Sequence, residues 1–378
     1  MTIETSPADG HAEFRTVLRT MLNSRAPVSA ARAAYAGAAA HDASLWKLFA
    51  QELDLLGPTI SESFGGAGLA RSELVVVAEE MGRVLLGGPY FSTVILAAEA
   101  LAASGDDDIA GQYLPRIAGG ELTAALGVAE GIGGWQETAV TTTARAEAGG
   151  IRISGTKKFV LGGADADLLV IAARDSSGRV SLFLVDPLAA GVTRTAQQVL
   201  DRTRPAARID LADAAATRVG APGDGWSIIE QVLEHAAIFL AAEQVGGSQI
   251  CLDSAVAHAK QRVQFGRPVG GFQGVKHRLA DMAVRTEIAR STVHWAAQQP
   301  PNSPDSGLGV GVARSWCTDA YLRNALDCIQ VHGGIGITWE HDSHLFLRRA
   351  RADASVLPEP RAYRRQLETH IAGGEGQP

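Results

Sequence analysis

The stretch Arg262-Val-Gln-Phe-Gly-Arg-Pro-Val269 is followed closely by Phe272-Gln-Gly-Val-Lys-His277 and Leu279-Ala-Asp-Met282. Arg262 ends a helix-like run, and its planar guanidinium can donate two parallel hydrogen bonds to a phosphate group. Taken alone, an arginine at a helix end is as well explained by a solvated charge that interacts with the helix dipole. The stretch therefore has to be judged together with a second block of the sequence.

The second block is Gln330-Val-His-Gly-Gly-Ile-Gly336. Gly333, Gly334 and Gly336 have no side chains, so their backbone amides can come close to a phosphate or a dinucleotide. A glycine pair by itself more often marks the end of a helix. The order of the two blocks along one chain is what favours a dinucleotide site.

Both blocks resemble the acyl-CoA dehydrogenase family, which carries R-x-Q-F-G-x-P … F-Q … K-H … L-A-D-M and then Q-x-x-G-G-x-G. The resemblance covers essentially the whole chain and implies an FAD cofactor. The residues implied for its diphosphate and adenosine end are Arg262, Phe265 and Gln273. Those implied to complete the pocket across a subunit interface are Gln330, Gly333 and Gly334. A shared site implies an oligomer, either a homotetramer or a heterotetramer.

Hydrophobic periodicity divides the chain into helical, strand-rich and helical parts. We predict an α+β, acyl-CoA dehydrogenase-like fold with an N-terminal helical domain (1–122), a middle antiparallel β-domain (123–222) and a C-terminal four-helix bundle (223–378). The predicted N-terminal helices are Phe14–Leu22, Ala30–Ala40, Ser44–Leu55, Ser72–Leu85 and Ser92–Ala103. The predicted strands are Thr138–Ala146, Ile151–Gly155, Leu168–Ala173, Val180–Val185 and Arg208–Leu211.

Composition narrows the functional classes. The chain has 378 residues, 46% of them hydrophobic, and a formal net charge of -7, which argues against binding to nucleic acid or to an anionic membrane surface. No run of about eighteen apolar residues could span a bilayer. The three cysteines form no CxxC pair or zinc-like spacing, so we expect no metal, buried structural thiols at Cys251 and Cys328, and a reducing cytoplasm.

Two loops depart from the family pattern. The family's T-E-P-x-x-G-S-D loop corresponds to Ala129-Glu-Gly-Ile-Gly-Gly-Trp-Gln136, which keeps the glutamate and glycines but lacks the Ser-Asp pair. The family's W-I-T-N strand corresponds to Phe159-Val-Leu-Gly162. Phe159 can still present an aromatic face to the flavin, whereas Leu161 lacks the hydroxyl that usually binds it.

The catalytic base is missing from both places where the family usually carries it. The glutamate of the family's Y-E-G motif corresponds to Leu357, and Glu359 nearby is flanked by prolines. A second family position, on the helix before the arginine block, corresponds to Ala236. Glu243 lies seven residues further on, which is about two turns and therefore the same helix face.

Glu243 lies in Leu240-Ala-Ala-Glu-Gln-Val-Gly-Gly247, a small and apolar stretch. The stretch resembles actinobacterial acyl-CoA dehydrogenases that act on steroid side chains, in which a glutamate on this helix is thought to be the base and assemblies are often heteromeric. Gly246 and Gly247 would let another backbone or a ligand approach closely. The alternative is that Glu243 is an ordinary solvated or ion-paired helix residue.

The leading hypothesis is an FAD-dependent acyl-CoA dehydrogenase. Glu243 would abstract the α-proton of an acyl-CoA to give a 2,3-enoyl-CoA, and electrons would pass to an electron-transfer flavoprotein. The alternative is a non-catalytic partner subunit of a heteromeric acyl-CoA dehydrogenase, because the Y-E-G glutamate and parts of the flavin loops are missing. A flavin oxidase or monooxygenase on the same fold has no specific support in the sequence.

Overall fold

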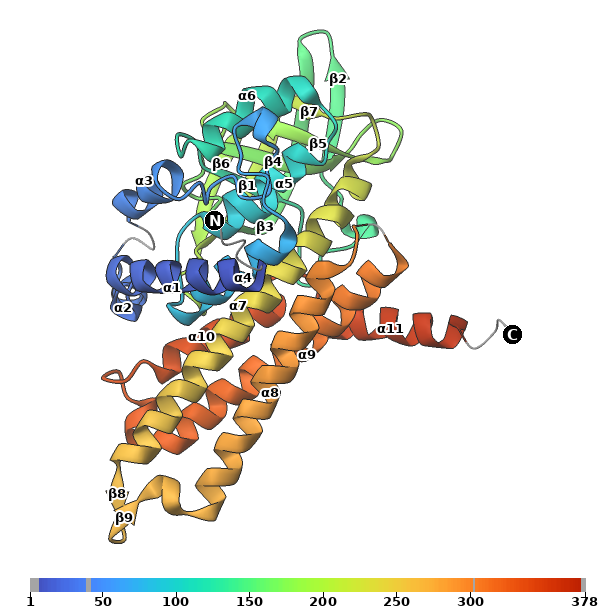
Figure 1. Cartoon of the computed structure of the whole chain (residues 1–378). Coiled ribbons are helices and arrows are strands. Elements are labelled where there is room, and N and C mark those ends of the chain that lie inside the picture. Colours follow the sequence, from blue (N-terminus) through green and yellow to red (C-terminus); the bar gives the residue numbers. More distant parts are fainter. Residues whose placement is uncertain (1–6, 39–41, 302, 375–378) are drawn as a thin grey trace, which may run out of the picture. The chain divides into compact units, whose positions relative to one another are not determined.

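The computed structural model describes residues 7–38, 42–301 and 303–374, which form two compact units (Figure 1). Unit 1 takes the described parts of Met1–Gly37, Arg71–Leu86 and Ala237–Pro378, and unit 2 takes those of Ala38–Ala70 and Gly87–Ala236. The predicted fold class is confirmed, because a β-sheet follows N-terminal helices and precedes a C-terminal helical bundle. The two compact units are not consecutive stretches of the chain, because α1 and α4 belong to the same unit as the C-terminal helices.

Unit 2 is built around a sheet whose strands close into a ring (Figure 1). The strands are β1 (Ala124–Gly127), β2 (Thr143–Glu147), β3 (Gly150–Leu161), β4 (Leu168–Arg174), β5 (Val180–Val185), β6 (Val192–Gln197) and β7 (Ala206–Val219). The ring runs β4–β2–β3–β7–β5 and returns to β4, while β1 pairs with β4 and β6 with β7. Ile153, Ile171, Phe183 and Ile209 are fully buried in its core.

Most strand pairs are antiparallel, as predicted, but β1 and β4 pair in parallel, and so do β2 and β4 at one residue pair. β1 and β6 were not predicted from the sequence, and the predicted strand Thr138–Ala146 is wrong in its first half. Residues Glu137–Ala139 form a short 3-10 turn (η3) and the strand begins only at Thr143. Threonines and Val140 run through both halves of this segment and favour extended chain, so the sequence could not separate them.

The helical segments of unit 2 lie before the sheet in the sequence. They are α3 (Ala43–Gln51), η1 (Glu62–Phe64), the π-helical segment η2 (Phe91–Ala98), α5 (Glu99–Ala102) and α6 (Asp107–Ala118). The predicted helix Ser92–Ala103 is therefore η2 and α5 together. Helix α6 was not predicted; Asp106 caps it by accepting from Ile109 N at 3.1 Å, and Pro115 lies inside it.

Unit 1 contains the C-terminal bundle. Its helices are residues 237–261 of α7 (Gly225–Gln261), α8 (Gln273–Gln298), α9 (Pro304–His332) and α10 (Ser343–Val356). The remaining elements are α1 (Pro7–Arg25), α2 (Val28–Tyr35), α4 (Arg71–Arg83), β8 (Val263–Gln264), β9 (Arg267–Pro268), η4 (Val269–Gly271), η5 (Gly333–Ile337) and α11 (Pro360–Gly374). The predicted helix Ala30–Ala40 ends at Tyr35, and its last two residues lie outside the described ranges.

Helices α4 and α7 touch backbone to backbone. A Cβ placed on Gly82 would lie 2.0 Å from the carbonyl oxygen of Glu243, and one placed on Gly246 would lie 1.9 Å from that of Glu79. The next glycine, Gly247, faces the ring of Tyr321 on α9, with 2.4 Å between the built Cβ and the ring. The predicted close approach of another backbone is therefore confirmed for Gly246, whereas the neighbour that approaches Gly247 is a side chain.

Two buried carboxylates on α4 bind the neighbouring helices. Glu79 is 1% exposed and accepts from Arg15 of α1 at 2.6 Å and from Arg290 of α8 at 2.5 Å. Glu80, also 1% exposed, accepts from Arg19 of α1 at 2.7 Å. Burial opposes ionisation, but the interactions with His294 and with the positive charges of Arg290 and Arg15 lower the pKa of Glu79 below its usual value. These pairs satisfy charges that would otherwise be costly to bury.

Among the described residues, no helix combines the length and the apolarity that crossing a bilayer requires. Cys251, Cys317 and Cys328 are free thiols and are buried, which confirms the interpretation of Cys251 and Cys328 as structural residues.

Replacing Gly82 or Gly246 by alanine is expected to lower the free energy of unfolding by about 3 kcal/mol, because α4 and α7 must move apart to admit the methyl group. Gly111→Ala is the matched control, since nothing lies within 4 Å of its built Cβ in helix α6. That control should gain about 0.5–1 kcal/mol from the better helix former. Urea denaturation measures all three variants, and equal effects at the three sites would contradict the contact.

Candidate functional site

The two sequence blocks meet at one end of the bundle in unit 1. Arg262 follows the last residue of α7, and its carbonyl accepts from Val269 N at 2.8 Å, which closes the β8–β9 hairpin. His332, which precedes the glycine block, packs its ring 4.5 Å from that of His258 on α7. Ser254 Oγ lies 3.4 Å from His332 Nε2. The arginine and glycine blocks of one chain thus lie at the same bundle end.

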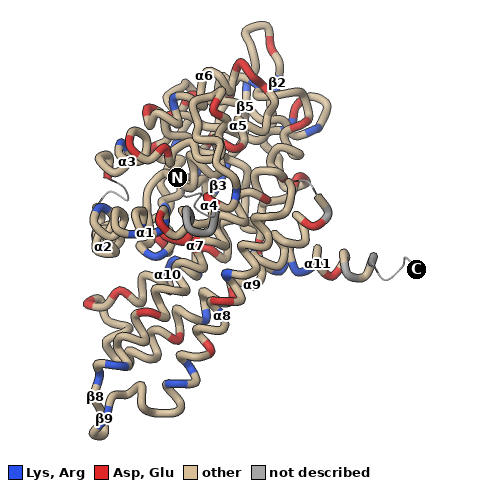
Figure 2. Tube along the Cα trace, in the orientation of Figure 1, with Lys and Arg blue, Asp and Glu red and all other residues tan. Residues whose placement is uncertain are grey.

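The residues of these blocks are available to a ligand. The exposed ones are Arg262, Phe265, Gln273, Gln330, Gly333 and Gly334. Phe265 is 91% exposed and has a positive φ of 53° at the hairpin tip. Gly333 ends α9 with φ 67°, and no atom lies within 4 Å of the Cβ position of Gly333 or Gly334. Basic segments flank β8 and β9 (Figure 2).

This donor set suits a dinucleotide. An arginine fork and open glycine amides match the geometry and charge of a diphosphate, and an exposed aromatic ring can cover a base or a sugar.

A column of imidazoles supports the glycine block from inside the bundle. The rings of His258 and His341 lie 4.5 Å and 4.1 Å from that of His332. Burial opposes protonation of His332, but hydrogen bonding to Cys328 outweighs it and raises the pKa of the imidazole. His332 is buried, and its Nδ1 lies 2.7 Å from the carbonyl oxygen of Cys328, so it shapes the helix end rather than reaching solvent.

Phe159 belongs to unit 2, where it lies on an irregular part of β3. The pairing of β3 with β7 shifts register between Lys157 and Val160, and Phe159 has a positive φ of 56°. Its N–H donates to Gln197 Oε1 at 2.9 Å, and 45% of the residue is exposed. A bulge of this kind turns a side chain away from the regular alternation of a strand. The aromatic ring is thus presented at the surface of unit 2.

The loop that replaces T-E-P-x-x-G-S-D is held by its glutamate. Glu130 accepts from Lys157 Nζ at 2.6 Å, from Thr142 N at 2.9 Å and from Thr142 Oγ1 at 2.7 Å. Thr141 donates to it as well, through its N–H at 2.9 Å and its hydroxyl. Burial opposes ionisation, yet the hydrogen bonds from Lys157 and Thr141 lower the pKa of Glu130 to about 2.

Lys157 is the fully buried half of this pair. Its ammonium also donates to Val128 O at 3.1 Å, and burial lowers its pKa to about 8 despite the opposing effect of Glu130. Above the loop, a hollow of about 700 Å³ is lined by the glycines 131, 133 and 134 together with Lys158 and Arg208. The loop backbone is thus anchored on one side and open to a ligand on the other.

Glu243 is buried in unit 1, where its side chain is 5% exposed. Its Oε1 lies 3.7 Å from Nη1 of Arg349 on α10, whose side chain is 3% exposed. The solvated alternative is therefore wrong, and the ion-paired alternative describes the geometry. The structure does not gather Glu243 with the dinucleotide residues, because the eighteen residues 244–261 of α7 separate it from Arg262, a distance of about 28 Å along the helix.

The two usual base positions are occupied by apolar groups. Leu357 is 1% exposed and Ala236 is fully buried. Glu359 is 38% exposed and pairs with Arg361 at 2.6 Å, which makes it a surface ion pair. Of the carboxylates considered from the sequence, Glu243 alone is enclosed by the protein.

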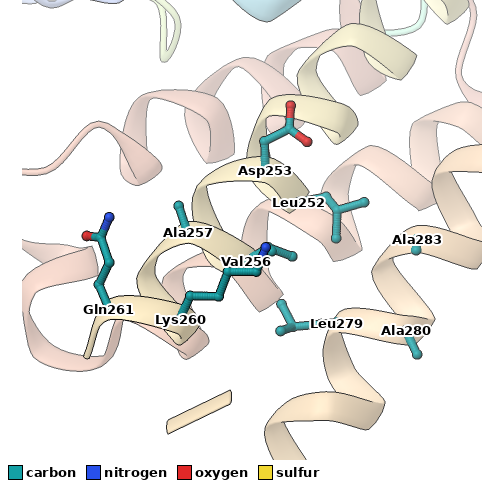
Figure 3. Close-up of a pocket in the computed structure, with 9 residues that line it drawn as sticks. All are labelled: Leu252, Asp253, Val256, Ala257, Lys260, Gln261, Leu279, Ala280 and Ala283. Atoms are coloured by element: carbon teal, nitrogen blue, oxygen red, sulfur yellow. The ribbon is translucent and has the colours of Figure 1, made fainter. Parts of the chain in front are cut away.

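A further groove runs between α7 and α8 (Figure 3). Its floor is apolar and includes Leu252, Val256 and Leu279, while Asp253 and Lys260 stand on the same helix at its rim. The groove has a volume of about 650 Å³ and carries no cluster of groups suited to chemistry. An apolar groove on the outside of a bundle is typical of a surface that meets another protein chain.

Two residues of the site were not found from the sequence. Lys157 follows Gly155-Thr156 in a strand, and its burial could have been suspected only from the apolar residues on that face. Arg349 lies in a run rich in arginine, Arg348-Arg-Ala-Arg351, where the sequence does not tell the buried member from its exposed neighbours.

Comparison with known proteins bears on both units. The models of the acyl-CoA dehydrogenase N-terminal, middle and C-terminal domains match residues 8–121, 125–213 and 223–356. The chain belongs to the acyl-CoA dehydrogenase family. Members of this family are flavin-dependent oxidoreductases that act on the CH–CH group of an acyl-CoA, so the resemblance recognised in the sequence is confirmed.

Three relatives of this acyl-CoA dehydrogenase are informative. Acyl-CoA dehydrogenase IpdE2 of Mycobacterium tuberculosis (strain H37Rv) is 32% identical over 366 residues, which cover 97% of this chain and 98% of that protein. The solved Tcur3481-Tcur3483 steroid ACAD variant has a TM-score of 0.85 at 28% identity, covering 98% of this chain and 100% of that one. The ChsE4-ChsE5 complex from Mycobacterium tuberculosis has a TM-score of 0.85 at 25% identity, with both chains covered completely.

The free energy of unfolding at low pH should depend on the ion pair between Glu130 and Lys157. The folded pKa of about 2 lies below the ordinary value of 4.5, so the stabilisation is complete above pH 4.5 and is lost as the pH falls toward 2. Glu130→Gln should be about 3 kcal/mol less stable at pH 7, because Lys157 loses its buried partner, and should lose less further stability between pH 4.5 and 2. Denaturation across that pH range measures this, with the exposed Glu147→Gln as control; parallel pH profiles for wild type and Glu130→Gln would contradict the assignment.

Proposed function

We propose that this enzyme is an FAD-dependent acyl-CoA dehydrogenase that converts an acyl-CoA thioester to its 2,3-enoyl-CoA, with Glu243 as the catalytic base. The observation that carries the proposal is the enclosure of the Glu243 carboxylate, at 5% exposure, in a chain whose other candidate positions are apolar or solvent-exposed. A carboxylate shielded from water can take a proton from the carbon next to a thioester carbonyl. Bound FAD supplies the acceptor for the hydride that leaves the β-carbon.

The residues proposed to bind FAD are those that the family resemblance implies. Arg262, Phe265 and Gln273 are proposed to hold the diphosphate and adenosine end. Gln330, Gly333 and Gly334 are proposed to complete the FAD pocket of a neighbouring subunit, and their exposure at the end of the bundle supports this. Phe159, exposed on its bulge, is proposed to face the flavin ring.

The proposed assembly and the proposed electron acceptor are those that the family resemblance implies. We propose a homotetramer or heterotetramer, which the apolar groove along α7 and α8 supports, and an electron-transfer flavoprotein as acceptor. Similarity to the steroid ACAD and to the ChsE4-ChsE5 complex supports a bulky acyl group and a heteromeric assembly. Three free cysteines fit a cytoplasmic enzyme.

Glu243→Gln is expected to slow anaerobic bleaching of the flavin by a reactive acyl-CoA by at least about 100-fold, because the amide cannot accept the α-proton. A panel from short acyl chains to steroid-CoA thioesters identifies the substrate first. Glu230→Gln, an exposed residue on the same helix, is the matched control and should bleach at the wild-type rate. Bleaching by Glu243→Gln at the wild-type rate would sink the assignment of the base.

The second candidate function is that of a non-catalytic partner subunit. The observation that favours it is Leu357, buried where the family's Y-E-G glutamate would stand, in a chain similar to a heteromeric complex. In that case the chain purified alone would hold no FAD or would show no bleaching with any acyl-CoA until a partner chain is added.

Flavin binding tests the dinucleotide block directly. Arg262→Met should weaken FAD binding about tenfold to a hundredfold, because a charged hydrogen bond to the diphosphate contributes about 1.5–3 kcal/mol. The exposed Arg323→Met on α9 is the control for loss of a positive charge and should bind FAD as the wild type does. Titration of the apoprotein with FAD measures both, and equal affinity of the two variants would refute the role of Arg262.

A further inference from the structure

Arg349 is a buried cation that the family resemblance did not point to. It lies on α10, 2% exposed, and its Nη2 donates to the carbonyl oxygens of Leu86 at 3.0 Å and Leu85 at 3.4 Å. These carbonyls belong to the turn that follows α4, where Leu85 takes a positive φ of 54°. The chain turn after α4 is thus shaped so that it presents two acceptors to one guanidinium.

The other side of the same guanidinium faces Glu243. Nη1 lies 3.7 Å from Oε1, which is an ion-pair distance but is longer than a hydrogen bond. This contact therefore stabilises the negative charge of Glu243 without a shared proton. The backbone of Glu243 is fixed independently, because Gly82 of α4 lies against its carbonyl group.

We propose that Arg349 is the positioning residue of the base: its guanidinium, held by the Leu85 and Leu86 carbonyls, fixes where the Glu243 carboxylate lies. The inference rests on the proposed function. In the reaction the C–H bond at the α-carbon breaks and its proton forms an O–H bond on Glu243. The hydrogen bonds to the two carbonyls do not depend on the charge of Glu243, so Arg349 keeps its place during this step.

The other charged groups near this position are engaged elsewhere. On α4, the carboxylates of Glu79 and Glu80 bind arginines of α1 and α8. On α9, Arg314 donates to Thr318 Oγ1 at 2.5 Å and to Asp353 O at 2.6 Å, while Thr318 donates to Gln244 at 3.2 Å. Arg349, by contrast, lies at an ion-pair distance from Glu243.

The test compares the maximal rate of anaerobic flavin bleaching, and the substrate concentration that gives half of that rate, for the substrate found in the acyl-CoA panel. Arg349→Met should lower the maximal rate about tenfold or more and leave the half-saturating concentration nearly unchanged, because the base is displaced while the substrate still binds. Arg349→Lys keeps the charge and should recover part of the rate. Arg348→Met, the adjacent arginine, is the control and should leave both quantities unchanged.

A thermal denaturation cycle with wild type, Glu243→Gln, Arg349→Met and the double variant gives a readout without substrate. Arg349→Met should melt lowest because it removes the cation that lies 3.7 Å from a buried carboxylate, and adding Glu243→Gln should restore part of the loss. An unchanged maximal rate in Arg349→Met, or, if that variant does not fold, a double variant that is no better folded, would overturn the proposal. Absence of bleaching in wild type would overturn the proposed function instead, while the melting cycle would still decide whether the two residues are coupled.

Discussion

The backbone contact between α4 and α7 is the constraint on which the candidate base depends. Two glycines, Gly82 and Gly246, allow each helix to reach the carbonyl groups of the other, so the axis of α7 cannot slide past α4. Glu243 stands within this contact. The same contact fixes the end of α4. The carbonyl groups of Leu85 and Leu86, in the turn that follows α4, are therefore available to Arg349. One packing interaction thus sets both the carboxylate and the cation beside it.

The same contact explains the buried acids of α4. The backbone of Glu79 faces Gly246, and its side chain points to Arg15 and Arg290 on two other helices. A helix that is fixed by backbone contact on one side and by ion pairs on the other has little freedom to rotate. Rigid supporting elements of this kind are what a precisely held catalytic group requires.

Local patterns in the sequence were sufficient for much of the fold and for part of the site. The Val- and Ile-rich runs predicted β4 and β5 closely, because strands buried on both faces read as continuous apolar segments. Gly246 was correctly interpreted as a point of close approach of another backbone. Helix α6 was missed because Pro115 interrupts its pattern, and β6 because its residues are mostly exposed and polar.

The partners of the site residues could not be predicted for a different physical reason. Arg349 and Lys157 are buried charges, and burial of a charge depends on a partner that is distant in the sequence. Glu243 and Arg349 are separated by more than a hundred residues, as are Leu85 and Arg349. A single sequence without an alignment contains no signal for such pairs.

The boundaries between the three predicted domains stay a prediction. The two compact units of the structure do not test them, because one unit combines N-terminal helices with the C-terminal bundle.

Where the chain departs from the family pattern, residues that hold the backbone in shape are kept and residues expected to touch the ligand are lost. The loop at 129–136 has lost the Ser-Asp pair expected to touch the ligand but has kept Glu130, which the buried Lys157 holds from below. Its shape is therefore maintained by a group that does not depend on the lost residues. The proposed base shows the same separation, because Glu243 lies on a packed helix between α4 and α10, whereas the family's Y-E-G glutamate would lie on the segment after α10. A carboxylate on a packed helix has fewer accessible positions than one on a connecting segment, so its place is set by the fold before any ligand binds.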